Sequence, residues 1–183
     1  TILVERLGLE ISEANRRTLQ HDRELSETRR LIAAAAISTL THAVANPGDP
    51  DYAYCHDAVA WLVQRKVSMS EVGRLRIGVL PTLQHLRLRI QDPTQFERAR
   101  AYVNARGSKT EKADLLPSNP RATNAWIGAP LFIWDKAPGV PARFKVRPVG
   151  ANRDVQPIVL GLDDGALGWY GLTTQQHLLG AEG

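Results

Sequence analysis

Arginine is the residue type whose number and spacing most plainly suggest a chemistry in this sequence. Between residues 72 and 106 the chain carries seven arginines but only two acidic residues, Asp92 and Glu97. Seven against two leaves a local surplus of five positive charges, whereas the formal net charge of the whole chain is +4. The planar guanidinium group matches the geometry of a phosphate better than the point charge of lysine does. This segment therefore indicates a polyanionic partner.

A second basic run lies nearer the C-terminus, where Arg143, Lys145 and Arg147 alternate with Phe144 and Val146. In a β-strand such alternation puts the apolar residues on one face and the basic residues on the other. If that basic face lay beside the first segment, the two would form a continuous groove. The predicted nucleic-acid-binding residues are Arg74, Arg76, Arg87, Arg89, Arg98, Arg100, Arg106, Arg143, Lys145 and Arg147.

Aromatic residues could add base stacking to such phosphate contacts. The candidates are Trp126, Trp134, Trp169 and Tyr170. The competing interpretation, which we favour, places these rings in the core of the C-terminal half.

Catalytic chemistry has less support. The five histidines show no ligand spacing, and the chain contains no phosphate-binding loop, His-Glu-x-x-His motif or Gly-x-Ser-x-Gly motif. Cys55, His56 and Asp57 are consecutive, and neighbours on a helix point about 100° apart, so they cannot form a catalytic triad among themselves. Asp49, Asp51 and Asp57 could gather a divalent metal ion, but a helix cap already explains Asp49 and a solvated loop explains Asp51. We therefore expect no catalytic residue, metal or cofactor.

Length and composition favour one globular domain. The 183 residues are 43% hydrophobic and 23% charged, which is enough for a buried core. The single cysteine excludes an internal disulfide and fits an intracellular, reducing compartment or a particle assembled in one. No apolar run approaches the roughly 20 residues of a membrane-spanning helix, so we expect a soluble protein with no membrane partner.

The N-terminal region is predicted to be helical, with a change of character near residue 30. Leu3, Leu7 and Ile11 suit a short amphipathic helix. Residues 12–30 are compatible with a helix but have too few apolar positions to hold it to a core. We predict that residues 1–30 form a polar helical arm used in self-association, and a solvated surface helix is the open alternative. Residues 31–46 are rich in alanine and aliphatic residues and are predicted to form a core helix.

Helix-capping signals divide the middle of the chain. They are Asp49-Pro50, the capping box formed by Ser68 and Glu71, and Asp92-Pro93. Residues 72–90 fit two patterns, because their apolar residues have helical spacing but also alternate with arginines on both sides of Pro81. We favour helices broken near Pro81, and a β-hairpin is the alternative.

Beyond residue 107 frequent prolines and glycines break any helical pattern. Short β-like runs lie at residues 131–134, 143–149, 157–162 and 166–172, and the last two are joined by a hairpin signal at residues 163–165. The predicted fold class is therefore α+β, mainly α. A polar arm (1–30) and a helical core (31–107) with about four to five helices precede a Pro/Gly-rich segment (108–183), whose short antiparallel strands pack on the core.

These features lead to one functional hypothesis and two alternatives. We predict a non-enzymatic, self-associating protein that binds nucleic-acid backbone, RNA or DNA, as a nucleoprotein or capsid-like coat subunit. The first alternative is a protein–protein adaptor or scaffold without affinity for nucleic acid. The second is a metal-dependent nuclease-type enzyme, which would need several acidic residues gathered in one pocket.

Overall fold

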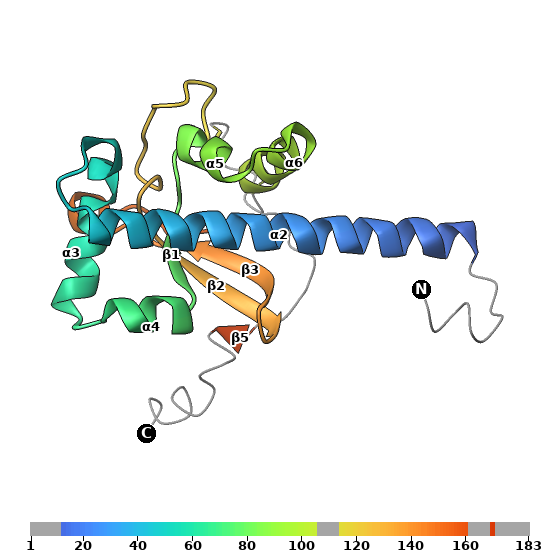
Figure 1. Ribbon diagram of the computed structural model, residues 1–183, viewed down its shortest axis with the longest axis horizontal. Coiled ribbons are helices and arrows are strands. Elements are labelled where there is room, and N and C mark those ends of the chain that lie inside the picture. The colour runs from blue at the N-terminus through green and yellow to red at the C-terminus, as the bar shows by residue number, and fades with distance from the viewer. Residues whose placement is uncertain (1–11, 106–113, 161–168, 171–183) are drawn as a thin grey trace.

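The longest element of the protein is helix α2 (Glu13–Ala45), seen in a computed structural model that describes residues 12–105, 114–160 and 169–170 (Figure 1). Ser12 caps its start by accepting a hydrogen bond from the backbone N–H of Asn15. The predicted change near residue 30 appears as a change in burial along one unbroken helix. Residues 13–23 are exposed, whereas Ile32, Ala36 and Leu40 are fully buried.

Eleven further elements follow in the described part of the chain. They are η1 (Pro50–Cys55), α3 (His56–Gln64), α4 (Met69–Arg74), β1 (Ile77–Val79), α5 (Leu83–Arg89), α6 (Pro93–Asn104), β2 (Pro130–Ala137), β3 (Val140–Val146), η2 (Gly150–Asn152), β4 (Ile158–Leu160) and β5 (Trp169–Tyr170). The predicted class is confirmed: within the described residues, five α-helices accompany an antiparallel sheet whose main strands lie in the C-terminal part. The predicted helix at residues 1–11 and the predicted turn at residues 163–165 lie outside the described residues.

The three capping signals begin helices where the sequence predicts. Asp92 accepts a hydrogen bond from the Gln95 N–H at 2.8 Å at the start of α6. Both bonds of the capping box at Ser68 are present at the start of α4. Asp49 caps a 3₁₀ turn, η1, which leads directly into α3.

Residues 72–90 adopt a third arrangement that neither prediction describes. The helix α4 ends at Arg74 and α5 begins after Pro81, as the broken-helix pattern predicts. Between them, Ile77, Gly78 and Val79 form strand β1, which pairs with β2 and not with residues 86–90. The hairpin interpretation was therefore wrong, and three residues of the favoured helical interpretation are extended.

The strands form one antiparallel sheet in the order β1-β2-β3-β4, with β5 also pairing with β2. Its inner face carries fully buried residues: Leu131, Ile133, Phe144 and Val146. The opposite, outer face carries their neighbours in sequence, Phe132 and Trp134 on β2 and Arg143 and Lys145 on β3. This is the alternation that the basic run at residues 143–147 predicts.

Helices α2 and α6 cover the inner face. The ring of Tyr102 on α6 meets Phe144 edge-on, with ring centroids 6.0 Å apart. Gly78 lies so close to α2 that an added Cβ would be 2.6 Å from the backbone carbon of Ala36. Below α2, in the view of Figure 1, helices α3 and α4 flank the β1 side of the sheet, where Leu62 and Val72 share a second buried cluster.

A buried ion pair fixes the turn between α4 and β1 to strand β2. Asp135 is completely buried, and its Oδ1 accepts a hydrogen bond from Arg76 Nη2 at 3.2 Å. Its Oδ2 lies 3.2 Å from Arg76 Nε and accepts from the Gly139 N–H. Arg76 has a φ of 54°, a left-handed conformation that a non-glycine residue keeps only when its surroundings hold it there. The ion pair and the Ile133 N–H bonded to the Arg76 carbonyl supply that constraint.

None of the helices in the described part of the chain combines the length and the apolar character that crossing a membrane requires.

The contact between β1 and α2 makes Gly78 intolerant of a side chain. Replacing Gly78 with alanine should lower the free energy of unfolding by about 1 to 3 kcal/mol, because the added methyl group must displace helix backbone. Urea denaturation followed by circular dichroism measures the change. Gly73→Ala is the matched control, because nothing lies within 4 Å of its added Cβ. Equal stability of the two variants would contradict the close packing.

The ion pair yields a second prediction. Asp135→Asn should lower the free energy of unfolding by about 3 kcal/mol, because it leaves the Arg76 guanidinium without its counter-charge in a largely buried site. The exposed pair of Arg17 and Glu13 provides the comparison: Glu13→Gln should cost less than about 0.5 kcal/mol. Similar losses in the two variants would mean that the buried pair contributes no more than a surface pair.

Candidate nucleic-acid interface

The predicted basic residues do not gather on one surface. Arg74 and Arg76 lie at α4, a second group lies on α5 and α6, and a third group lies on and just after β3. Figure 1 shows α5 and α6 above α2 and the sheet below it. The outer face of the sheet points away from the helices that cover the inner face, so no continuous groove joins the second and third groups. Arg106 lies outside the described residues.

The first group is engaged in local ion pairs. Arg74 Nη2 lies 3.4 Å from Glu71, one turn earlier in α4. Arg76 is held by Asp135, with its side chain only 19% exposed. The guanidinium of Arg76 thus stabilises the fold by pairing with a buried carboxylate, and it is not part of the candidate interface.

The second group is partly neutralised by carboxylates. Arg98 pairs with Glu24 of α2 at 3.4 Å, and Arg100 pairs with Glu97 at 3.6 Å. The remaining two, on α5, have no carboxylate partner among the described residues. One of them, Arg87, lies over the ring of Phe96, 4.8 Å from its centroid. The surplus counted along the sequence is therefore smaller on the folded surface.

The third group lies among aromatic and aliphatic side chains. The strand register aligns Phe132 on β2, Lys145 on β3 and Val159 on β4 in one row across the outer face. The next row pairs Trp134 with Arg143. Phe132 and Trp134 are half-buried, and Val159 is 39% exposed. Lys145 has no carboxylate partner among the residues that the structure describes.

Helix α3 extends this surface beyond the sheet. The ring of Trp61 meets Phe132 edge-on, with centroids 5.9 Å apart. The guanidinium of Arg65 lies over the Trp61 ring, 4.2 Å from its centroid. We use the name outer-face patch for Trp61, Arg65, Phe132, Trp134, Arg143, Lys145 and Val159, together with the exposed Arg147 that follows β3.

Several members of this patch escaped the sequence analysis. Trp61 and Arg65 are one helical turn apart, the spacing at which side chains on a helix meet, and this signal could have identified them. Phe132 alternates with inward-facing neighbours on β2, but only the pairing of β2 with β3 shows that it lies next to Lys145. Among the predicted stacking residues, Trp134 lies on the outer face. Trp126 instead packs beside the core and donates to the Gln156 carbonyl at 3.1 Å.

A second polar cluster gathers histidines that are far apart in the sequence. His42 Nε2 lies 3.0 Å from Asp49 Oδ2, a contact that lowers the pKa of the Asp49 carboxyl. The ring of Tyr52 lies between His42 and His85, with centroid distances of 4.1 and 4.3 Å. The sequence gives no spacing signal for this cluster, because it brings together the end of α2, η1 and α5.

Two hydroxyl groups surround one nitrogen of His85. Its Nδ1 is 2.8 Å from Thr82 Oγ1 and 3.0 Å from the hydroxyl of Tyr54. Burial lowers the pKa of His85, an effect that the carboxylates of Asp51 and Asp49 oppose. Burial also raises the pKa of the Tyr54 hydroxyl above its ordinary value. At neutral pH both groups are therefore uncharged hydrogen-bonding groups.

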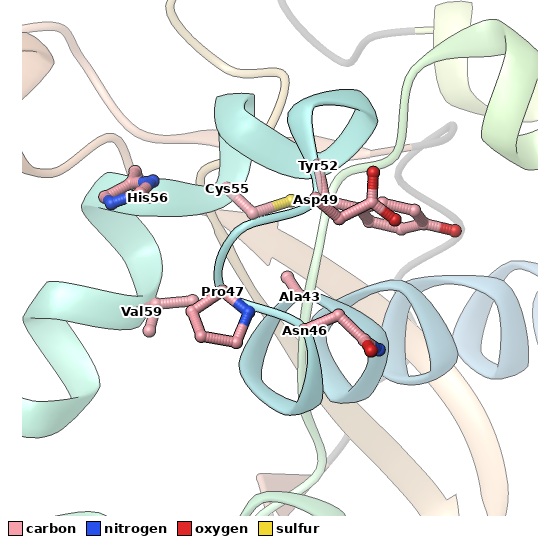
Figure 2. A pocket seen from close by; sticks show the side chains of 8 residues that line it. All are labelled: Ala43, Asn46, Pro47, Asp49, Tyr52, Cys55, His56 and Val59. Atoms are coloured by element: carbon pink, nitrogen blue, oxygen red, sulfur yellow. The ribbon is translucent and has the colours of Figure 1, made fainter.

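A small pocket of 40 Å³ lies beside this cluster (Figure 2). Burial raises the pKa of the Cys55 thiol at its edge to about 12, so the thiol stays protonated at neutral pH. Figure 2 shows the side chains of Cys55 and His56 pointing in different directions, as expected of neighbours at a helix start. Among the described residues no group of three histidine, cysteine or acidic side chains is placed to hold a metal ion.

No protein-family model matches this chain, and searches of curated proteins and of solved structures found no match. The outer-face patch and the polar cluster are thus the features that bear on function.

Proposed function

We propose that the chain binds single-stranded nucleic acid on the outer-face patch and self-associates along it, as a nucleoprotein or coat subunit does. The observation that carries the proposal is the alignment of rings and cations in neighbouring strands, with Phe132 beside Lys145 and Trp134 beside Arg143. Rings on a sheet surface offer a stacking platform to unpaired bases of any sequence.

The spacing of the sheet suits this role. Side chains directly opposite each other on neighbouring strands have Cβ atoms roughly 5 Å apart, so a cation can reach a phosphate while the adjacent ring stacks on the attached base. Double-stranded helices present no open base faces, so the rings favour an unpaired strand. The cations on α5 then contribute only to the general attraction of the protein for polyanions.

The arm hypothesis draws support from the exposed half of α2. Figure 1 shows the first half of the helix extending past the rest of the described protein. Residues 13–23 are exposed, and Leu19 remains 57% accessible on that segment. A helix without a core of its own is suited to packing on a second copy of the chain, and such contacts would align copies along a strand.

Charge removal on the outer-face patch tests the binding surface. The double variant Lys145→Gln and Arg147→Gln should bind a fluorescent single-stranded oligonucleotide about tenfold more weakly in fluorescence anisotropy at low salt. It should also reduce the slope of log K against log salt by about 1.4, because each phosphate contact on a single strand contributes roughly 0.7. The double variant Arg87→Gln and Arg89→Gln removes the same charge from α5 and should lose less affinity.

Trp134→Leu separates stacking from charge, and should weaken binding at least about fivefold without changing the salt slope. The circular dichroism spectrum of this variant should match that of the wild-type protein, which checks that the variant is folded. Equal losses in the two charge variants, or a wild-type affinity that barely responds to salt, would argue against the patch. Absence of any binding would favour the adaptor or scaffold alternative.

Self-association has its own test. Leu19→Glu places a charge on the protruding half of α2 and should shift the protein to a smaller species in size-exclusion chromatography with light scattering. Leu88→Glu is the matched control, because Leu88 is 60% exposed and lies on a different helix, α5. A monomeric wild-type protein, or the same shift in both variants, would contradict the role of the arm.

A further inference from the structure

A second pocket, with polar walls, borders the polar cluster through Tyr54 and His85 and plays no part in the proposed nucleic-acid surface. Its volume is 210 Å³, below the roughly 300 Å³ at which drug-sized sites begin, so it suits a small metabolite. Three segments build its walls: η1, the start of α5, and the loop that precedes β2. The lining residues are Pro50, Asp51, Tyr54, Thr82, Gln84, His85, Arg121 and Thr123.

Two of these residues carry opposite charges and do not pair with each other. Arg121 donates through Nε to Gln84 Oε1 at 3.3 Å, and has no carboxylate within ion-pair distance among the described residues. Asp51 is bonded through its backbone N–H to the Asp49 side chain at 3.0 Å, and its own carboxylate likewise has no cationic partner in the described part of the chain. Each side chain thus retains charge-assisted hydrogen-bonding capacity toward the pocket.

The other polar side chains that line the pocket include His85, Thr82 and Tyr54, which are uncharged and are held in place by hydrogen bonds to one another. The His85 side chain is 95% buried, since its exposed fraction is 5%. Its Nδ1 is occupied by the hydroxyls of Thr82 and Tyr54. The structure gives its Nε2 no hydrogen-bond partner among the described residues, so this ring edge is available to a guest in the pocket that His85 lines. If Nδ1 accepts from one hydroxyl, Nε2 carries the proton and donates.

We propose that this pocket binds a small zwitterion of the α-amino acid class. The ligand carboxylate pairs with Arg121, whose Nη atoms remain available because Gln84 engages Nε. The ligand ammonium group pairs with Asp51. The hydroxyls of Thr82 and Thr123 and the imidazole of His85 face the rest of the ligand.

The charge pattern selects against simpler ligands. An inorganic anion attracted by Arg121 would also meet the carboxylate of Asp51, and a simple amine attracted by Asp51 would meet the guanidinium of Arg121. A molecule that carries both charges satisfies both walls at once, so it gains two charge-assisted contacts and no repulsion. The inference is independent of nucleic-acid binding, because the pocket and the outer-face patch share no residue.

Isothermal titration calorimetry with the standard L-amino acids on the full chain tests this inference. At least one should bind with a dissociation constant of about 1 mM or tighter. The amino acid that binds is then compared with two single-charge analogues, one without the amino group and one without the carboxylate, which for alanine are propionate and ethylamine. Any binding by these analogues should be at least about tenfold weaker than that of the amino acid. Guanosine monophosphate is included as a probe for a nucleotide occupant.

Two surface substitutions locate the site. Arg121→Gln and Asp51→Asn should each weaken amino-acid binding about tenfold or more, and both residues are exposed, so the fold should tolerate the changes. Arg147→Gln, on the outer-face patch, should leave it unchanged. The proposal is overturned if no amino acid binds up to about 10 mM, if the analogue without the amino group binds as well as the amino acid itself, or if only the nucleotide binds. Full affinity in either pocket variant would also overturn it.

Discussion

The close approach of helix α2 to strand β1 is the contact on which the rest of the fold depends. At Gly78 the strand meets the helix backbone at Ala36, with no room for even a methyl group between them. This contact is possible because α2 presents alanines at its middle and β1 presents a glycine. Strand β2 pairs with β1 and the sheet continues through β3 and β4, and its inner face is buried under α2 and α6. Loosening this one contact would weaken both layers.

Burial of one sheet face determines what the other face can display. Because side chains alternate along a strand, burial of Leu131, Ile133 and Phe144 under α2 and α6 places Phe132, Trp134 and Lys145 on the opposite face, where Phe132 also packs against the second buried cluster. The rings on the outer face are thus positioned by backbone that the core holds rigid. The polar cluster is positioned differently, since it lies where the end of α2, η1 and α5 converge. The outer-face patch and the polar cluster are therefore chemically distinct, and different parts of the fold hold them in position.

Sequence patterns predicted the structural features that depend on a few neighbouring residues. They did not predict the features that depend on contacts between distant segments. The capping residues Asp49, Ser68 and Asp92 act within three residues, and the alternation of residues 143–147 is local, so the helix starts and strand β3 were predictable. Strand β1 was not, because three residues carry little periodic signal and become a strand only through pairing with β2. The meeting of His42 and His85 around Tyr52 likewise joins residues separated by forty-three positions. No spacing pattern within the sequence encodes such a contact.

The arginine count shows why net charge along a sequence is a weak guide to an interface. Arg76 serves a buried ion pair, and Arg98 and Arg100 meet carboxylates on α2 and α6. Folding thus neutralises cations that the linear count treats as available. A charge contributes to recognition when the fold keeps it near a surface, leaves it without a carboxylate and places it beside groups that complement the rest of the ligand. Among the described residues, Lys145 meets these conditions beside Phe132, and Arg121 meets them in a pocket that Asp51 also lines, although neither lies in the arginine-rich stretch.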